Sequence, residues 1–237
     1  MAASPDEPGH SAERVSGGPP RDLLARLDDP VAERTEWTPL VRLGTHLHTH
    51  RLVQDSVSRW SMRPTLAVRL PSGLMCLLFV AIGVMLLVGG VLGLRNPAAV
   101  LSQSVWAGLL YLGLGVCGFY VASAGIRQYW WVCQPRVFDL QAKGYWRGAG
   151  PPGVGTPKAG RHSAPLEEVH AVQILGELVR GTRATELRDF MSYEINLVLD
   201  DGRRVNVVDH GSLEHIRKDA AAIGDLIGVP VWDATGT

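Results

Sequence analysis

The fold is decided by residues 74–94, which read LMCLLFVAIGVMLLVGGVLGL, and by residues 105–126, which read VWAGLLYLGLGVCGFYVASAGI. Neither stretch contains a charged side chain. At 1.5 Å per residue, a helix of either length spans the roughly 30 Å hydrocarbon core of a bilayer. Asn96 and Pro97 follow the first stretch and are typical of a turn. The sequence therefore predicts a hairpin of two transmembrane helices within residues 67–127.

Basic residues near the ends of these stretches predict the orientation. Arg95 is the one cation close to the connection, whereas several lie outside the pair of stretches. These outer cations are Arg59, Arg63, Arg69, Arg127, Arg136 and Lys143. Because Lys and Arg accumulate on the cytoplasmic side, both termini are expected in the cytoplasm. Residues 1–20 lack the apolar core of a secretory signal.

Two groups of residues are expected to position the helices. Arg127, Tyr129, Trp130 and Trp131 follow the second stretch, where amphipathic side chains favour the membrane interface. Small residues at a spacing of four permit close helix contact, and they are Gly89 and Gly93 in the first stretch and Gly118 and Ala122 in the second. This packing is expected within the hairpin, with homodimerisation through the same face as the alternative. The absence of an ionisable side chain inside either stretch disfavours a channel or pump.

Composition excludes further classes. The 23 basic and 23 acidic residues give no net charge, so a nucleic-acid partner is not expected. Three cysteines provide no disulfide framework and fit a reducing compartment. Motifs of serine hydrolases, zincins, thioredoxin-like proteins and P-loop proteins are missing from the sequence. No cofactor is expected.

The remaining chain divides into three parts. Residues 1–35 are rich in Pro, Gly, Ser and charge and are expected to form a disordered tail, with one short amphipathic pattern at Leu23, Leu24 and Leu27. Residues 36–66 are expected to be cytoplasmic and to contain a β-hairpin with strands at about 46–53 and 57–63. Residues 135–233 predict a series of strands and one closing helix.

Within residues 135–233, the clearest pattern is SYEINLVLDDGRRVNVVDH, a β-hairpin reversing at Asp201 and Gly202. Ser212 then offers a helix N-cap, and Gly228 and Pro230 end the helix. RVFDL and YWRG form an earlier hairpin about Lys143 and Gly144, and LEEVHAVQIL predicts a further strand. Residues 176–190 are ambiguous.

This arrangement resembles bacterial membrane proteins that carry a pleckstrin-homology-like (PH-like) domain beside a transmembrane hairpin. The likeness covers roughly residues 135–233. It implies an α+β membrane protein of the inner membrane, with a bent antiparallel sheet of seven strands capped by a carboxy-terminal helix. About five strands are visible after the second apolar stretch. Either residues 176–190 contain another, or the hairpin at 46–63 completes the sheet. With Lys143 as the one cation in the first hairpin loop, recognition of a specific lipid headgroup is not expected.

The sharpest candidate site is the pattern His46, His48 and His50. Strand alternation would place all three imidazoles on one face, about 6 to 7 Å apart and within reach of one metal ion. An exposed polar strand face is the competing interpretation. A second group, Asp209, His210 and His215, has the residue types of acid–base catalysis or of a turn into the last helix.

The sequence as a whole predicts a non-catalytic protein-binding or scaffolding element held at the lipid bilayer, with a protein partner or a second copy of the chain. The alternative is a metal-dependent enzyme of the membrane surface that uses His46, His48 and His50.

Overall fold

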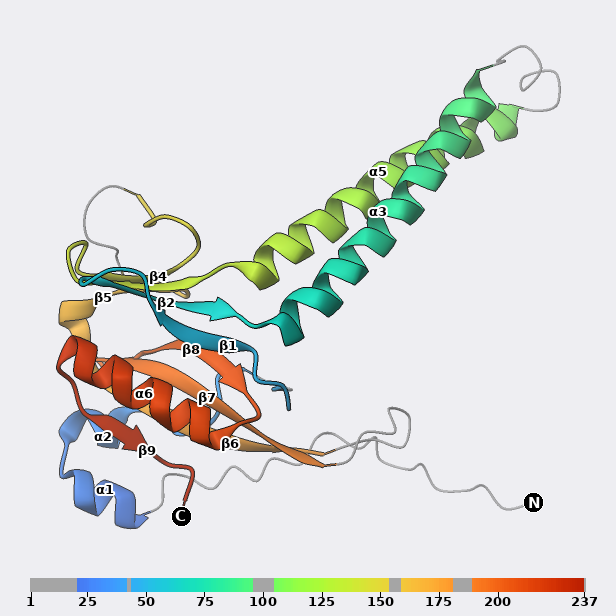
Figure 1. The fold of residues 1–237 in the computed structure, drawn as a ribbon. Helices are drawn as coiled ribbons and strands as arrows, with labels where there is room; N and C mark the ends of the chain where they lie inside the picture. Colours follow the sequence, from blue (N-terminus) through green and yellow to red (C-terminus); the bar gives the residue numbers. More distant parts are fainter. Residues whose placement is uncertain (1–20, 42–43, 96–104, 154–158, 181–188, 237) are drawn as a thin grey trace, which may run out of the picture. The chain divides into compact units, whose positions relative to one another are not determined.

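The computed structural model describes residues 21–41, 44–95, 105–153, 159–180 and 189–236. It is a mixed α+β chain, as the sequence predicts, and it separates into two compact units (Figure 1). The sheet unit combines Met1–Met62 with Arg136–Thr237, and the helical unit is Arg63–Pro135.

The sheet unit contains a five-stranded and a four-stranded sheet. The first has the order β1 (His50–Gln54), β2 (Arg59–Pro64), β3 (Arg136–Asp139), β4 (Gly144–Arg147) and β5 (Ser163–Pro165). The second has the order β8 (Arg204–His210), β7 (Phe190–Leu199), β6 (Val169–Val179) and β9 (Val231–Asp233). A short 3₁₀ turn, η1 (Leu166–Glu168), leads from β5 into β6.

Strands β2 and β3 pair although the whole helical unit separates them in the chain. Their antiparallel register runs from Arg59 opposite Asp139 to Met62 opposite Arg136. This pairing confirms the alternative in which the hairpin before the first apolar stretch completes the sheet formed after the second. The helical unit is therefore inserted between two neighbouring strands of one sheet.

The four-stranded sheet contains the expected hairpin, formed by β7 and β8, and has β9 as an additional edge strand. Gly202 has a φ of +83°, which glycine adopts without steric cost, and it forms the turn between β7 and β8. Strand β6 extends to Val179 and β7 begins at Phe190, so the two ends of the ambiguous segment 176–190 belong to this sheet. Residues 181–188 lie outside the described part. The terminal β9 pairs parallel to β6.

Helix α6 (Leu213–Ile227) closes the core between the sheets. Ile216, Ala220 and Ile223 recur at helical spacing and are fully buried. They pack with inward residues of both sheets, including Phe138 and Ile195. Gly228, with a φ of +74°, ends the helix as expected. Ser212 occupies the N-cap position, but its hydroxyl contacts His215 Nδ1 at 2.7 Å and does not cap the helix.

A second core covers the other face of the four-stranded sheet and differs from the expected disordered tail. Helices α1 (Arg21–Leu27) and α2 (Pro30–Arg34) are ordered, and residues 1–20 lie outside the described part. Asp29 caps α2 through a 2.8 Å bond from Val31 N–H. Trp37 stacks on Trp232 with ring centroids 5.8 Å apart. These short helices are ordered because the four-stranded sheet and Trp232 supply the other half of this core.

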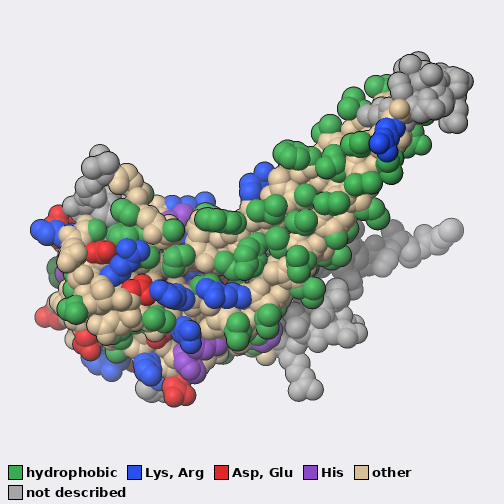
Figure 2. Space-filling model, turned by 45° about the horizontal axis from the view of Figure 1, so that its top comes forward, with side chains coloured by type: hydrophobic (Ala, Val, Ile, Leu, Met, Phe, Trp, Pro, Cys, Tyr) green, Lys and Arg blue, Asp and Glu red, His purple; other side chains and the backbone are tan. Residues whose placement is uncertain are grey.

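The helical unit consists of α3 (Leu66–Leu94) and α5 (Val105–Cys133). Both helices are longer than expected, so Arg69, Arg127 and the aromatic residues 129–131 lie within helices. Leu66–Leu92 and Trp106–Cys133 are long and apolar enough to cross a membrane, with mean hydropathies of 2.8 and 1.8. Figure 2 shows hydrophobic side chains covering the visible face of these helices.

Close packing of α3 against α5 takes place at glycines. A Cβ atom on Gly118 would lie 2.4 Å from the Gly83 carbonyl oxygen, and one on Gly83 would lie 2.7 Å from the Ala122 Cβ. Gly118 and Ala122 therefore lie at the contact within the hairpin. A Cβ on Gly89 would meet nothing within 4 Å, so the partner position on α3 is Gly83. The surroundings of Gly93 lie outside the described part.

This contact makes a testable prediction. We expect Gly118→Ala to destabilise the hairpin by about 1–3 kcal/mol, because the new methyl group overlaps the backbone of α3. Gly113→Ala on the same helix is the matched control, since a Cβ there meets nothing within 4 Å. The midpoint of thermal aggregation in detergent measures the difference. Equal midpoints for the two variants would contradict this packing.

Candidate functional site

The three histidines of the sequence pattern have three different surroundings. Strand β1 begins only at His50, so strand alternation does not apply to His46 and His48. The His46 ring packs edge-on against Phe190, with centroids 5.3 Å apart. His48 lies near His210 and His215. The structure therefore does not gather His46, His48 and His50 around one point.

His50 has both ring nitrogens engaged. Arg136 donates to its Nε2, its Nδ1 lies 2.9 Å from the Thr49 hydroxyl, and that hydroxyl donates to the Asp209 carbonyl at 2.6 Å. The side chain is 4% exposed. Burial, together with the Arg136 cation, lowers the pKa of His50 to about 2. His50 is therefore a neutral structural acceptor for a buried guanidinium.

A different cluster forms around His48, which we call the histidine cluster: His48, His210, His215 and Asp219. One ligand atom each from His48, His210 and Asp219 lies within 4.8 Å of the others. The His48 and His215 ring centroids are 4.2 Å apart. His210 is the last residue of β8, and the other two, His215 and Asp219, are one turn apart on α6.

The backbone brings these residues together. Gly211 N–H donates to the Leu47 carbonyl at 3.1 Å, and a Cβ on Gly211 would lie 2.4 Å from the His46 carbonyl oxygen. Glycine at this position thus permits the segment before β1 to lie against the start of α6. The sequence pattern indicated His210 and His215 as candidates, but it did not predict that they lie next to His48. The spacing of His215 and Asp219 was the available signal, and the pairing with His48 depends on the tertiary fold.

Burial shifts the pKa values of three members of the histidine cluster. It lowers the pKa of His48, with a contribution from His215, and it lowers the pKa of His210 to about 3. Burial raises the pKa of Asp219 to about 6, against the opposing effect of His215 and Lys218. At neutral pH, His48 and His210 are therefore neutral imidazoles, the form that binds metal ions.

A polar network fixes the segment before the cluster. Glu194 on β7 is 3% exposed, and its carboxylate accepts from Leu40 N–H at 2.8 Å, Val41 N–H at 3.2 Å and Asn196 Nδ2 at 2.7 Å. Arg204 donates to the Thr38 carbonyl at 2.7 Å. These contacts hold residues 36–41 against the four-stranded sheet.

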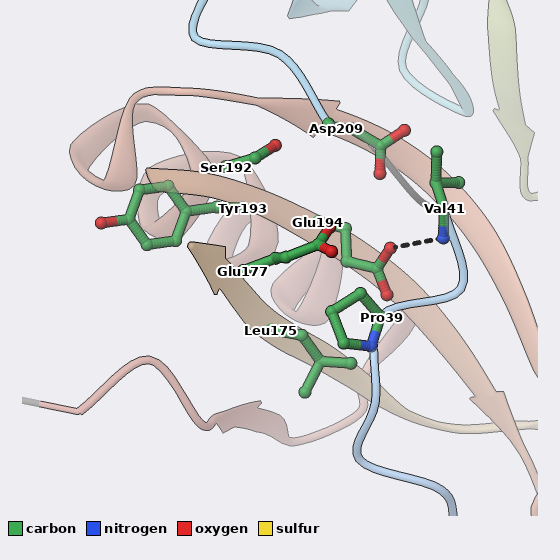
Figure 3. Close-up of a pocket in the computed structure, with 9 residues that line it drawn as sticks. Pro39, Val41, Leu175, Glu177, Ser192, Tyr193, Glu194 and Asp209 are labelled. Atoms are coloured by element: carbon green, nitrogen blue, oxygen red, sulfur yellow. Dashed lines mark hydrogen bonds between the residues drawn. The ribbon is translucent and has the colours of Figure 1, made fainter. Parts of the chain in front are cut away.

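A small pocket lies beside this network, between Pro39, Leu175, Glu194 and Asp209 (Figure 3). It has room for about one water molecule. Burial and the Glu194 carboxylate raise the pKa of Asp209 to about 7. The pocket is far smaller than the roughly 300 Å³ that small-molecule sites occupy. It is therefore too small to hold a substrate.

The expected interface residues occupy the end of α5. Trp130 is 66% exposed and Trp131 is 45% exposed. Arg127 lies over the Tyr120 ring at 5.8 Å and donates to the Ser123 hydroxyl at 3.4 Å. Together with Tyr129, these residues form a helix end with large amphipathic side chains, which is the composition favoured at a membrane interface.

Comparisons with known proteins give no relative. No family model, no curated protein and no solved structure matches this chain. The function must therefore be argued from the geometry.

Proposed function

We propose that this chain is an integral membrane protein with two crossings, whose PH-like unit acts as a non-catalytic protein-binding or scaffolding element at the cytoplasmic face of the cell membrane. The observation that carries the proposal is the exposure of α3 and α5. In the most apolar window of each helix, only 11% of the residues are buried. In water, such a surface would be unfavourable, since each exposed apolar side chain forgoes about 1.5–3 kcal/mol of burial.

The arrangement of the sheet unit supports a PH-like module. Two sheets enclose one core, and α6 follows the last long strand and closes that core. The unit departs from the family pattern because β1 and β2 precede the membrane hairpin in the chain and β9 follows the closing helix.

A binding role fits this unit better than catalysis. The pocket beside Asp209 has room for only about one water molecule. His46, His48 and His50 do not come together as the metal centre on which the enzymatic alternative depends. β1 is an edge strand of the five-stranded sheet, and an edge strand can serve as a template for a further strand. An extended peptide from another protein or a second copy can add to such an edge.

A photo-crosslinking amino acid at Arg51 tests this role in native membranes. Arg51 is exposed on β1, and Lys218, exposed on α6, is the matched control position. We expect a crosslinked protein or a dimer of the chain from position 51 and none from position 218. The absence of any product specific to position 51 would contradict partner binding at this edge.

A further inference from the structure

The histidine cluster combines donor atoms from three separate parts of the sheet unit. His48 comes from the segment before β1, His210 from the end of β8 and Asp219 from α6. Their ligand atoms lie within 4.8 Å of one another. Zinc ligands lie about 2.0–2.2 Å from the ion, which places them about 3.4 Å from each other in a tetrahedral site. A movement of about 1 Å by side chains would therefore bring the three atoms to ligand spacing.

Two of the donor atoms are buried without a partner in the described part of the chain. His210 is 0% exposed, and neither its Nε2 nor Asp219 Oδ2 forms a hydrogen bond there. A buried polar atom without a partner costs about 1–3 kcal/mol, so such atoms are rare in folded proteins. A cation between them would satisfy the imidazole lone pair and the carboxylate together.

The ring of His210 can present Nε2 to an ion. Ser212 N–H donates to its Nδ1 at 3.4 Å, a long contact. Binding through Nε2 moves the ring proton to Nδ1, and this weak hydrogen bond is then lost. His215 is exposed and lies beside these three donors, with its ring centroid 4.2 Å from that of His48 and 6.5 Å from that of His210, so it would reach the ion by a larger side-chain movement. Its Nδ1 is engaged by the Ser212 hydroxyl at 2.7 Å, which leaves Nε2 as the possible ligand atom.

We infer that His48, His210 and Asp219 bind a divalent transition metal ion of the zinc type, with His215 as the fourth ligand. Two or three imidazoles with one carboxylate form a nitrogen and oxygen set suited to Zn²⁺, whereas Ca²⁺ and Mg²⁺ prefer oxygen ligands alone. The ion joins the segment before β1 to β8 and α6. Because this segment leads into β1, the metal would fix the start of the five-stranded sheet.

Metal binding by the full chain in detergent tests the inference. The protein is purified with a histidine-free tag, stripped with a chelator and titrated with Co²⁺, whose visible absorption reports tetrahedral coordination. We expect one equivalent of Co²⁺, displaced by Zn²⁺, and a rise in Tm of about 5 °C or more with Zn²⁺. His48→Gln and Asp219→Asn, which preserve side-chain size, are expected to weaken binding by a hundredfold or more.

His46→Ala is the matched control, because His46 belongs to the same sequence pattern but packs on Phe190. It is expected to leave the cobalt spectrum and the affinity unchanged. Unchanged Tm values of the metal-free His48→Gln and Asp219→Asn variants show that both still fold. Failure of the wild-type chain to bind Co²⁺ or Zn²⁺, or binding that persists in both ligand variants, would overturn the inference.

Discussion

Glu194→Ala is expected to release residues 36–41 from the sheet unit. The substitution removes the acceptor of the Leu40 and Val41 amides and of Asn196 Nδ2. Hydrogen bonds to a buried charge contribute about 1.5–3 kcal/mol, and the donors left behind are themselves unsatisfied. We expect a loss of about 3 kcal/mol in the local stability of this segment, which corresponds to hydrogen exchange about a hundredfold faster.

Hydrogen exchange followed by mass spectrometry measures this change at peptides covering residues 36–41. Glu36→Ala is the matched control, since Glu36 belongs to the same network but its side chain is 80% exposed and pairs with Arg204 at 3.2 Å. Only the Arg204 side chain of this pair is buried, and an ion pair with a solvent-exposed carboxylate contributes about 1 kcal/mol. Exchange at residues 36–41 that responds equally to both variants would contradict the burial of the Glu194 carboxylate under this segment.

Ile82→Arg is expected to prevent stable insertion of the first apolar helix. Ile82 lies near the middle of α3 and is 37% exposed. An arginine at the centre of a membrane-spanning helix costs about 2.5–3.5 kcal/mol for insertion. We therefore expect less full-length protein in the membrane fraction and more degradation, while the sheet unit itself is untouched by the substitution.

Membrane fractionation with an alkaline wash measures the effect, and Val57→Arg is the control because Val57 is 90% exposed on the turn between β1 and β2. The control is expected to behave as the wild type. If α3 faced water, Ile82→Arg would instead increase the yield of soluble protein. That result would contradict a lipid-facing helix.

Much of the fold follows from local sequence patterns. The two apolar stretches predict α3 and α5, the reversal at Gly202 predicts the hairpin of β7 and β8, and the spacing of Ile216, Ala220 and Ile223 predicts α6. These elements could be predicted because each one is specified by neighbouring residues. The predicted helix ends were less accurate, because residues such as Arg69 and Trp130 occur both inside helices and in the segments that flank them.

The remaining elements depend on tertiary contacts that local sequence patterns do not predict. Helices α1 and α2 are short, and they are ordered because Trp232 and Val198 supply the rest of their core. In the alternating pattern of its strand, Glu194 occupies a position expected to face solvent. In the structure, residues 36–41 cover it. The histidine cluster also could not be predicted locally, because both apolar helices lie between His48 and His210 in the sequence.

The orientation of the chain in the membrane is the central claim, and cysteine labelling in whole cells tests it most directly. In a cysteine-free background, Val57→Cys probes the sheet unit and Arg95→Cys probes the end of α3. With a maleimide that cannot cross the membrane, the account predicts labelling of position 95 in intact cells and of position 57 only after the membrane is opened. Labelling of position 57 in intact cells, or recovery of the chain in the soluble fraction, would contradict it.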